Sequence, residues 1–217
     1  MSLICGIDEA GKGPVIGPLV ICGVLISEKD LPKLQALNPK DSKLLTPKRR
    51  SELEKKIKQV VKDYKIIKVS PKEIDNAVES KTLNLNWLEA IKCAEIINSL
   101  KPNTVFLDCP SNNINAFSDY LKNYLDNKKI SLTCSHKADQ KYIIVSAASI
   151  LAKTTRDSEI EKIKEKIGIN FNSGYPSDEK TQEFLKKYHN KFPEIFRKSW
   201  ASYKNIKKAK QKSLAEF

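Results

Sequence analysis

Four acidic side chains stand at positions from which they could act together on a phosphate ester. Asp8 and Glu9 follow the apolar run Leu3–Ile7, Asp108 ends a second short apolar run, and Asp139 precedes a long helical pattern. Open α/β sheets place their sites where the carboxyl ends of the strands meet at one edge. We therefore expect these four carboxylates to share one pocket.

Four carboxylates in one pocket repel each other, and without cations some of them would take up protons. A ligand set made of oxygen atoms, with no partnering His or Cys, suits hard cations such as Mg²⁺ or Mn²⁺. Two such ions about 4 Å apart can bind one phosphate, activate a water molecule and stabilise the leaving oxygen. The pattern predicts hydrolysis of a phosphodiester with two divalent ions, Mg²⁺ or Mn²⁺.

The adjacency of Asp8 and Glu9 sets a condition on the backbone. Consecutive residues of a strand point to opposite faces, so these two side chains share a site only if the pleat breaks between them. Gly11, Gly13 and Pro14 follow directly and favour such a break. We expect the strand to end at the acids, with backbone N–H groups of the turn facing a ligand. The alternative is a surface turn with two solvated acids.

Other polar and aromatic residues have structural interpretations. Asp139 could merely cap the helix that follows it, since Asp is common at such positions. The remaining interpretations are a hydrogen-bonded structural His136, a local ion pair between Arg156 and Asp157, close helix packing at Ser146 and Ser149, and core positions for Trp87 and Trp200.

The elements that must position the acids follow from hydrophobic periodicity. The expected strands are Leu3–Ile7, Val15–Ile26, Lys65–Val69, Thr104–Leu107 and Ile130–Cys134. Helices are expected from Thr46 and Pro47, from Leu85, over Ile114–Leu125 and Val145–Ile167, from Ser177, and over Ile195–Trp200. A hairpin followed by alternating strands and helices predicts an α/β fold with a mixed five-stranded sheet flanked by helices. Residues 1–167 would form this domain, 168–203 a small C-terminal helical subdomain, and 204–217 a basic flexible tail.

Composition narrows the class of protein. The chain has 217 residues, and 39 Lys and Arg against 26 Asp and Glu give a net charge of +13. This excess is expected of a protein that binds nucleic acid, although lysine-rich surfaces are common among other proteins. The five cysteines are odd in number and form no CxxC pair, which favours buried reduced thiols. With no signal pattern and no apolar run long enough to span a bilayer, we expect a soluble, cytoplasmic monomer.

Several short motifs occur together and in order. They are Gly6-Ile7-Asp8-Glu9-Ala10-Gly11-Lys12-Gly13-Pro14, Asp41-Ser42-Lys43, Leu107-Asp108, His136-Lys137-Ala138-Asp139 and Ser146–Lys153, followed by Ser173–Ser177 and Arg197–Trp200. From residue 4 to about 203, the chain resembles the ribonuclease HII family, and the last two motifs resemble its archaeal type. The resemblance implies an RNase H-like fold. It implies cleavage of the RNA strand of RNA–DNA hybrids and cleavage 5′ of single ribonucleotides embedded in duplex DNA, which leaves 3′-hydroxyl and 5′-phosphate ends.

The resemblance also implies roles for individual residues. Asp8, Glu9, Asp108 and Asp139 correspond to the metal-binding catalytic acids. The turn Gly11-Lys12-Gly13 corresponds to the segment whose backbone reads the ribose 2′-hydroxyl, and Tyr175 to the ring that packs on the sugar at the RNA–DNA junction. Lys43 and Lys153 correspond to residues that contact phosphates.

The chain departs from the family pattern at Lys12, where Arg is usual. If this residue acts through its backbone, the change has little effect. If its side chain contacts a phosphate, Lys provides a weaker, single-point contact than the guanidinium fork of Arg.

The C-terminal residues suggest a partner. Gln211, Leu214 and Phe217 are spaced like the short peptide by which replication proteins bind the sliding clamp. One tight turn would place Leu214 and Phe217 on the same side, facing an apolar pocket. The alternative is a frayed terminus.

Two further functions compete with this interpretation. A non-catalytic basic nucleic-acid-binding protein would account for the lysines but not for four acids at strand ends. An enzyme with the same chemistry could instead need a run of ribonucleotides, as type 1 ribonucleases H do.

Overall fold

The computed structural model describes residues 2–39 and 46–206. Its sheet has five strands in the order β3-β2-β1-β4-β5. The strands are β1 (Leu3–Ala10), β2 (Leu19–Ser27), β3 (Asp63–Val69), β4 (Thr104–Asp108) and β5 (Ser131–Ser135). β1 pairs antiparallel with β2 and parallel with β4, and β4 pairs parallel with β5. The predicted mixed five-stranded sheet is therefore confirmed.

The helices are α1 (Leu31–Ala36), α2 (Pro47–Val60), α3 (Pro71–Glu79), α4 (Leu85–Leu100), α5 (Ile114–Asn123), α6 (Ala138–Lys141), α7 (Ile143–Ile167) and α8 (Glu179–Tyr188). Short 3₁₀ turns cover η1 (Glu28–Asp30) and η2 (Pro193–Ile195). The predicted start of α2 is confirmed, because Thr46 accepts a hydrogen bond from the Arg49 N–H at 3.3 Å and Pro47 takes the first helical position.

One predicted helix is wrong, and helix α3 was missed. The helix expected over Ile195–Trp200 is absent, because Phe196 forms a β-bridge with Ile16 instead. Helix α3 was not predicted, although Ser70 caps it by accepting from the Glu73 N–H at 3.2 Å. The signal was a Ser followed three residues later by Glu, which is the pattern of a capping box.

Backbone contacts divide the chain into two compact units. The first, the sheet unit, comprises the described residues of Met1–Ala10, Val20–Lys68 and Leu85–Thr155. The second, the turn unit, comprises those of Gly11–Leu19, Val69–Asn84 and Arg156–Phe217. The units alternate along the chain, whereas the predicted division at residue 167 follows chain order. That division stays a prediction.

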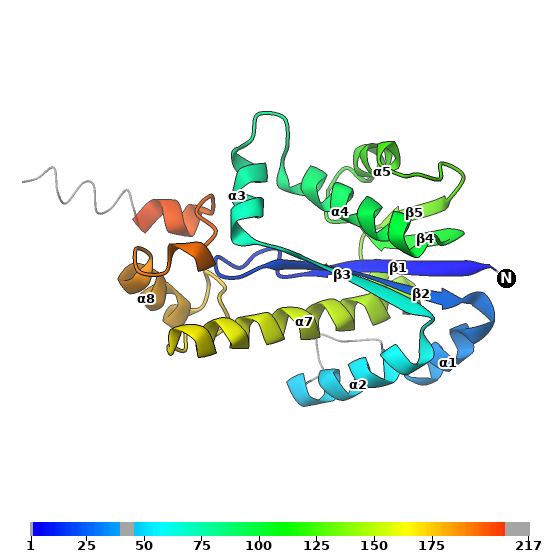
Figure 1. Ribbon diagram of the computed structural model, residues 1–217, viewed down its shortest axis with the longest axis horizontal. Helices are drawn as coiled ribbons and strands as arrows, with labels where there is room; N and C mark the ends of the chain where they lie inside the picture. The colour runs from blue at the N-terminus through cyan, green and yellow to red at the C-terminus, as the bar shows by residue number, and fades with distance from the viewer. Residues whose placement is uncertain (1, 40–45, 207–217) are drawn as a thin grey trace, which may run out of the picture. The chain divides into compact units, whose positions relative to one another are not determined.

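Within the sheet unit, helices cover both faces of the sheet. Figure 1 shows α4 and α5 on one face, and α1, α2 and the first half of α7 on the other. Every residue of β2 is buried, as expected for a strand covered on both sides. Helix α7 approaches β1 closely, since a Cβ atom on Gly6 would lie only 2.4 Å from the carbonyl carbon of Ile144. The even-numbered residues of β1 therefore face α7.

Within the turn unit, the loop of residues 11–18 is pinned by backbone hydrogen bonds. The N–H of Val15 donates to the carbonyl of Gly174 at 2.9 Å, and the N–H of Arg197 donates to the carbonyl of Val15 at 2.9 Å. Val15 and Ile16 belong to the apolar core of this unit, together with Phe171 and Phe184. The predicted strand Val15–Ile26 thus begins later, at Leu19.

Two further expectations concern the burial of the cysteine thiols and the presence of a membrane-spanning helix. Cys5, Cys22, Cys93 and Cys109 are buried thiols, as predicted, and Cys134 is half-buried. In the described part of the chain, no helix combines the length and the apolar character needed to cross a bilayer. The cytoplasmic location and the monomeric state stay predictions.

Candidate active site and glycine turn

Two of the predicted acids lie side by side in the sheet unit. The parallel register of β1 and β4 pairs Ile7 with Leu107, so the next residues along the two strands are Asp8 and Asp108. Asp8 is 5% exposed. Burial and, to a smaller extent, the charge of Asp108 raise the pKa of Asp8 to about 7. Strand register alone brings these two carboxylates together.

A hydroxyl and an ammonium group from α7 complete the surroundings of Asp8. The Ser149 hydroxyl hydrogen-bonds the Asp8 carboxylate, which opposes the rise in the pKa of Asp8. The Lys153 ammonium donates to the same hydroxyl at 2.7 Å, and its charge also lowers the pKa of Asp8. Lys153 was predicted to contact a phosphate, and Ser149 was interpreted as a packing residue only. The signal for Ser149 was its spacing of four residues from Lys153 on one helix face.

Glu9 is the next residue of β1 after Asp8, and its predicted place in the metal site stays a prediction. The prediction that the pleat breaks at the acids is wrong, because β1 continues to Ala10 and pairs Glu9 with Ile21 of β2. Burial raises the pKa of Cys93 on α4 well above its usual value, and the charge of Glu9 adds to this effect.

Asp139 directly follows Ala138, which contacts Asp108. The Ala138 N–H donates to the Asp108 carboxylate at 2.8 Å, and Asp139 follows in the first turn of α6. Lys137 is the N-cap of α6, and no side chain caps this short helix. The interpretation of Asp139 as a cap of the long helix that follows, α7, stays open. The Asp139 carbonyl accepts a hydrogen bond from the Ser146 hydroxyl.

His136 lies at the same end of the sheet, and its contact fits the structural interpretation. Its Nδ1 lies 3.3 Å from the Cys109 carbonyl oxygen. The ring is thereby tied to the backbone that follows β4.

The donor set near Asp8 fits a hard cation. Carboxylate oxygens are the ligands that Mg²⁺ and Mn²⁺ prefer. A divalent ion would offset the cost of burying Asp8 beside Asp108, which the raised pKa of Asp8 reports. Among residues 2–39 and 46–206, no three His, Cys, Asp or Glu side chains form a group that could hold a metal ion. The register of β1 and β4 brings Asp8 and Asp108 together, and the places of Glu9 and Asp139 in the metal site stay predictions.

The predicted glycine turn, Gly11-Lys12-Gly13, belongs to the turn unit and is held by its carbonyl groups. Gly11 has a φ of +84°, which favours glycine. The Arg197 guanidinium donates to the carbonyls of Gly11 at 2.6 Å and Lys12 at 2.8 Å. The Trp200 indole N–H donates to the Gly13 carbonyl at 3.1 Å. Three consecutive carbonyls therefore accept hydrogen bonds from one short segment near the C-terminus.

Tyr175 lies beside this turn. Tyr175 is 38% exposed, and a Cβ atom on Gly13 would lie 3.5 Å from the Cε1 atom of its ring. Arg156 stacks on the ring, with its guanidinium carbon 5.2 Å from the ring centroid, and donates to the Ser173 carbonyl at 2.6 Å. Arg156 also pairs with Asp157 at 3.4 Å, as interpreted from the sequence, but its role beside Tyr175 was missed.

Lys43 and the C-terminal residues Gln211, Leu214 and Phe217 lie outside the described residues. Their predicted roles stay predictions.

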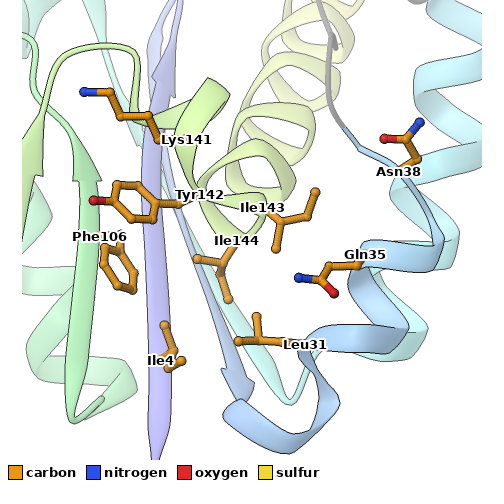
Figure 2. Close-up of a pocket in the computed structure, with 9 residues that line it drawn as sticks. All are labelled: Ile4, Leu31, Gln35, Asn38, Phe106, Lys141, Tyr142, Ile143 and Ile144. Carbon is orange, nitrogen blue, oxygen red and sulfur yellow. The ribbon is translucent and has the colours of Figure 1, made fainter.

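A cavity of about 520 Å³ opens elsewhere in the sheet unit. Figure 2 shows it between β1, β4, α1 and the start of α7, with the rings of Phe106 and Tyr142 on one side. It is lined by Ile4, Leu31, Gln35, Asn38, Phe106, Lys141, Tyr142, Ile143 and Ile144. None of these described lining residues is a carboxylate, and neither Asp8 nor Asp108 is among them.

Comparison with known proteins decides the family. The family model for ribonuclease HII matches residues 5–203. The chain belongs to the ribonuclease HII family. It is 47% identical to ribonuclease HII of Pyrococcus furiosus over 219 aligned residues, which cover 97% of this chain and 95% of that protein.

Solved structures agree with this family. The ribonuclease H2 of Pyrococcus horikoshii OT3 matches with a TM-score of 0.87 and 43% identity, over 95% of this chain and 98% of that one. The RNase HII of Archaeoglobus fulgidus, solved in complex with PCNA, matches with a TM-score of 0.83 and 40% identity, over 94% and 96%. The predicted RNase H-like fold is confirmed.

The family defines the activity at a general level. The protein is a type 2 ribonuclease H, an endonuclease and hydrolase that cleaves the RNA strand of RNA–DNA hybrids. The alternative of a non-catalytic nucleic-acid-binding protein is therefore wrong. The net charge of this chain, +13, suits a polyanionic substrate.

Proposed function

We propose that this type 2 ribonuclease H cuts 5′ of a single ribonucleotide embedded in duplex DNA and leaves 3′-hydroxyl and 5′-phosphate ends. The observation that carries the proposal is the buried Asp8 carboxylate beside Asp108 at neighbouring ends of parallel strands. Such a pair can hold a cation against a phosphodiester, which a purely cationic surface cannot do.

Two divalent ions, Mg²⁺ or Mn²⁺, would be held by Asp8 and Asp108, with Glu9 and Asp139 as the further predicted ligands. When bound, they supply an activated water and stabilise the charge on the leaving oxygen. The chain's own contribution is to orient the ligands. Ser149 fixes one side of the Asp8 carboxylate, and Lys153 holds the Ser149 hydroxyl at 2.7 Å and favours the ionised form of Asp8.

Recognition of the ribonucleotide would come from the turn unit. The 2′-hydroxyl is the group that distinguishes RNA from DNA at a given site. Backbone amides of the glycine turn and the phenol of Tyr175, whose ring packs beside Gly13, are suited to contact it. This arrangement does not depend on the side chain of Lys12.

The test is a cleavage assay on a duplex with one embedded ribonucleotide, next to an all-DNA duplex of the same sequence and an RNA–DNA hybrid. We expect a cut 5′ of the ribonucleotide in Mg²⁺ or Mn²⁺, no cut in EDTA, and no cut of the all-DNA duplex. Cleavage of the hybrid without any cut at the single ribonucleotide would contradict the proposal and select an enzyme that needs a run of ribonucleotides.

We also propose that the C-terminal peptide binds a sliding clamp through Gln211, Leu214 and Phe217. The support is the spacing of these residues together with the PCNA complex of the A. fulgidus relative. A Phe217→Ala variant should bind the clamp at least roughly tenfold more weakly, because the aromatic anchor of such a peptide supplies much of its affinity. Unchanged clamp affinity in a pull-down or calorimetric titration would exclude the proposal.

A further inference from the structure

We infer that the segment Arg197–Trp200 is a positioning device that fixes the peptide orientation of the glycine turn and thereby sets the selectivity for a ribonucleotide. The inference rests on the proposed function, since it concerns how the same 2′-hydroxyl is read. It assigns a role to Arg197, which the sequence analysis named only as part of a motif, and to Trp200, which it interpreted as a core residue.

The direction of the turn's amides follows from the positions of its carbonyls. The C=O and N–H groups of a trans peptide point in opposite directions, and no cis peptide bond occurs among the described residues. The carbonyls of Gly11 and Lys12 point to the Arg197 guanidinium. The N–H groups of Lys12 and Gly13, which belong to the same two peptide units, must then point away from Arg197. These are the donors that a 2′-hydroxyl could meet.

Arg197 is suited to this task by its shape and by its burial. It has 0% exposure, and its Nε also donates to the Gly17 carbonyl at 3.0 Å, so one guanidinium spans both ends of the loop. A planar fork with donors at fixed spacing holds several carbonyls in one geometry, which a single ammonium group cannot do. The Trp200 indole, stacked 5.0 Å from the Arg197 guanidinium carbon, adds the bond to the Gly13 carbonyl.

The segment is itself anchored by an acid on α3. The Asp75 carboxylate is 8% exposed and accepts from the N–H groups of Lys198 at 2.8 Å and Ser199 at 2.9 Å. It also accepts from the Ser199 hydroxyl at 2.6 Å. The two residues between Arg197 and Trp200 are thus fixed, so the two donor side chains keep their places on the turn.

The decisive variant is Trp200→Phe, which keeps an aromatic ring and removes the indole N–H. Its matched control is Trp87→Phe on α4, where the ring stacks on Tyr120. Each full-length protein is titrated in EDTA with a duplex carrying one ribonucleotide and with the identical all-DNA duplex. We expect the ratio of the two affinities to fall roughly three- to tenfold in Trp200→Phe, since one hydrogen bond to the turn is lost. Affinity for the all-DNA duplex should stay unchanged, and Trp87→Phe should keep the wild-type ratio.

A second variant, Arg197→Lys, retains the charge and loses the fork, and its ratio should fall by more than that of Trp200→Phe. If it does not fold, Trp200→Phe still decides. Suppose that the wild-type protein prefers the ribonucleotide duplex. If Trp200→Phe then keeps the same ratio of the two affinities, the positioning role alone is overturned. A wild-type protein with no preference would overturn both the positioning role and the proposed function.

Discussion

The acid pair of the sheet unit and the glycine turn of the turn unit are held in place by different physical means. Asp8 and Asp108 meet because two neighbouring parallel strands keep register, so backbone hydrogen bonds do the positioning. The glycine turn is held by side chains that donate to its carbonyls from positions 185 to 187 residues away in the chain. The first arrangement depends on secondary structure and the second on a few individual side chains.

This difference has a consequence for mutation. Changing a carboxylate should remove the chemistry and leave its surroundings intact, because the sheet does not depend on that side chain. Changing a residue around the turn should alter which substrate is chosen before it alters the chemistry. The predictions below test this separation between the two units.

The largest effect is expected for Asp8→Asn. The amide has nearly the shape of the carboxylate but cannot offer two charged oxygens to a cation. Loss of several kcal/mol of metal-dependent stabilisation corresponds to a fall in kcat on the order of a thousandfold or more. Single-turnover cleavage measures this fall, and duplex affinity in EDTA should stay within about twofold. Full activity would remove Asp8 from the site.

A smaller effect is expected for Tyr175→Phe in the turn unit. The phenol hydroxyl is lost while the ring beside Gly13 and the stacking of Arg156 are retained. The preference for a ribonucleotide duplex over the all-DNA duplex should fall roughly tenfold. Tyr188→Phe is the matched control, because Tyr188 packs against Phe184 and Phe192. If both variants lose the preference equally, the hydroxyl of Tyr175 has no special role.

The same contrast explains what could be predicted from the sequence. Apolar periodicity predicted all five strands, and the convergence of strand ends then brought Asp8 to Asp108. The predicted break of the pleat at the acids was wrong, because glycine comes only at Gly11 and the pairing with β2 continues to Ala10. Periodicity gave no sign of Arg197, whose partners are backbone carbonyls far away in the chain.

Ser149 shows an intermediate case. Its spacing from Lys153 on α7 was visible, yet small residues in an apolar helix favour packing, and only the structure shows its hydroxyl at Asp8. Arg156 is a similar case: it was paired with its sequence neighbour Asp157, and only the structure shows it stacked on Tyr175. Local spacing identifies a pair of residues, whereas the group they serve is set by tertiary packing.

The pH dependence of stability should distinguish the acid pair from the turn. In EDTA, the folded protein holds a proton on Asp8 up to a pKa of about 7, because burial and Asp108 raise it from 3.8. The folded state therefore binds more protons than the unfolded state between these values, and stability falls as pH rises through this range.

Asp8→Asn removes this loss. In EDTA, the difference between the Tm of Asp8→Asn and that of the wild type should grow by a few °C as the pH rises from about 5 to about 8. The corresponding difference for Trp200→Phe should not change with pH. Thermal unfolding followed by circular dichroism measures both. A Tm difference independent of pH would show that Asp8 is ionised at ordinary pH despite its burial.

The smallest effect is expected for Lys12→Arg, which restores the residue usual in the family. The carbonyls of Gly11 and Lys12 are already held by Arg197, so the amides that follow them keep their direction whichever side chain stands at position 12. We expect kcat/KM on the single-ribonucleotide duplex to change by less than about threefold, with an unchanged preference over all-DNA duplex. An increase well beyond this, with a steeper salt dependence, would show that this side chain forks onto a phosphate. The turn would then act through charge as well as through its backbone, and the contrast between the two units would be weaker than their hydrogen bonds indicate.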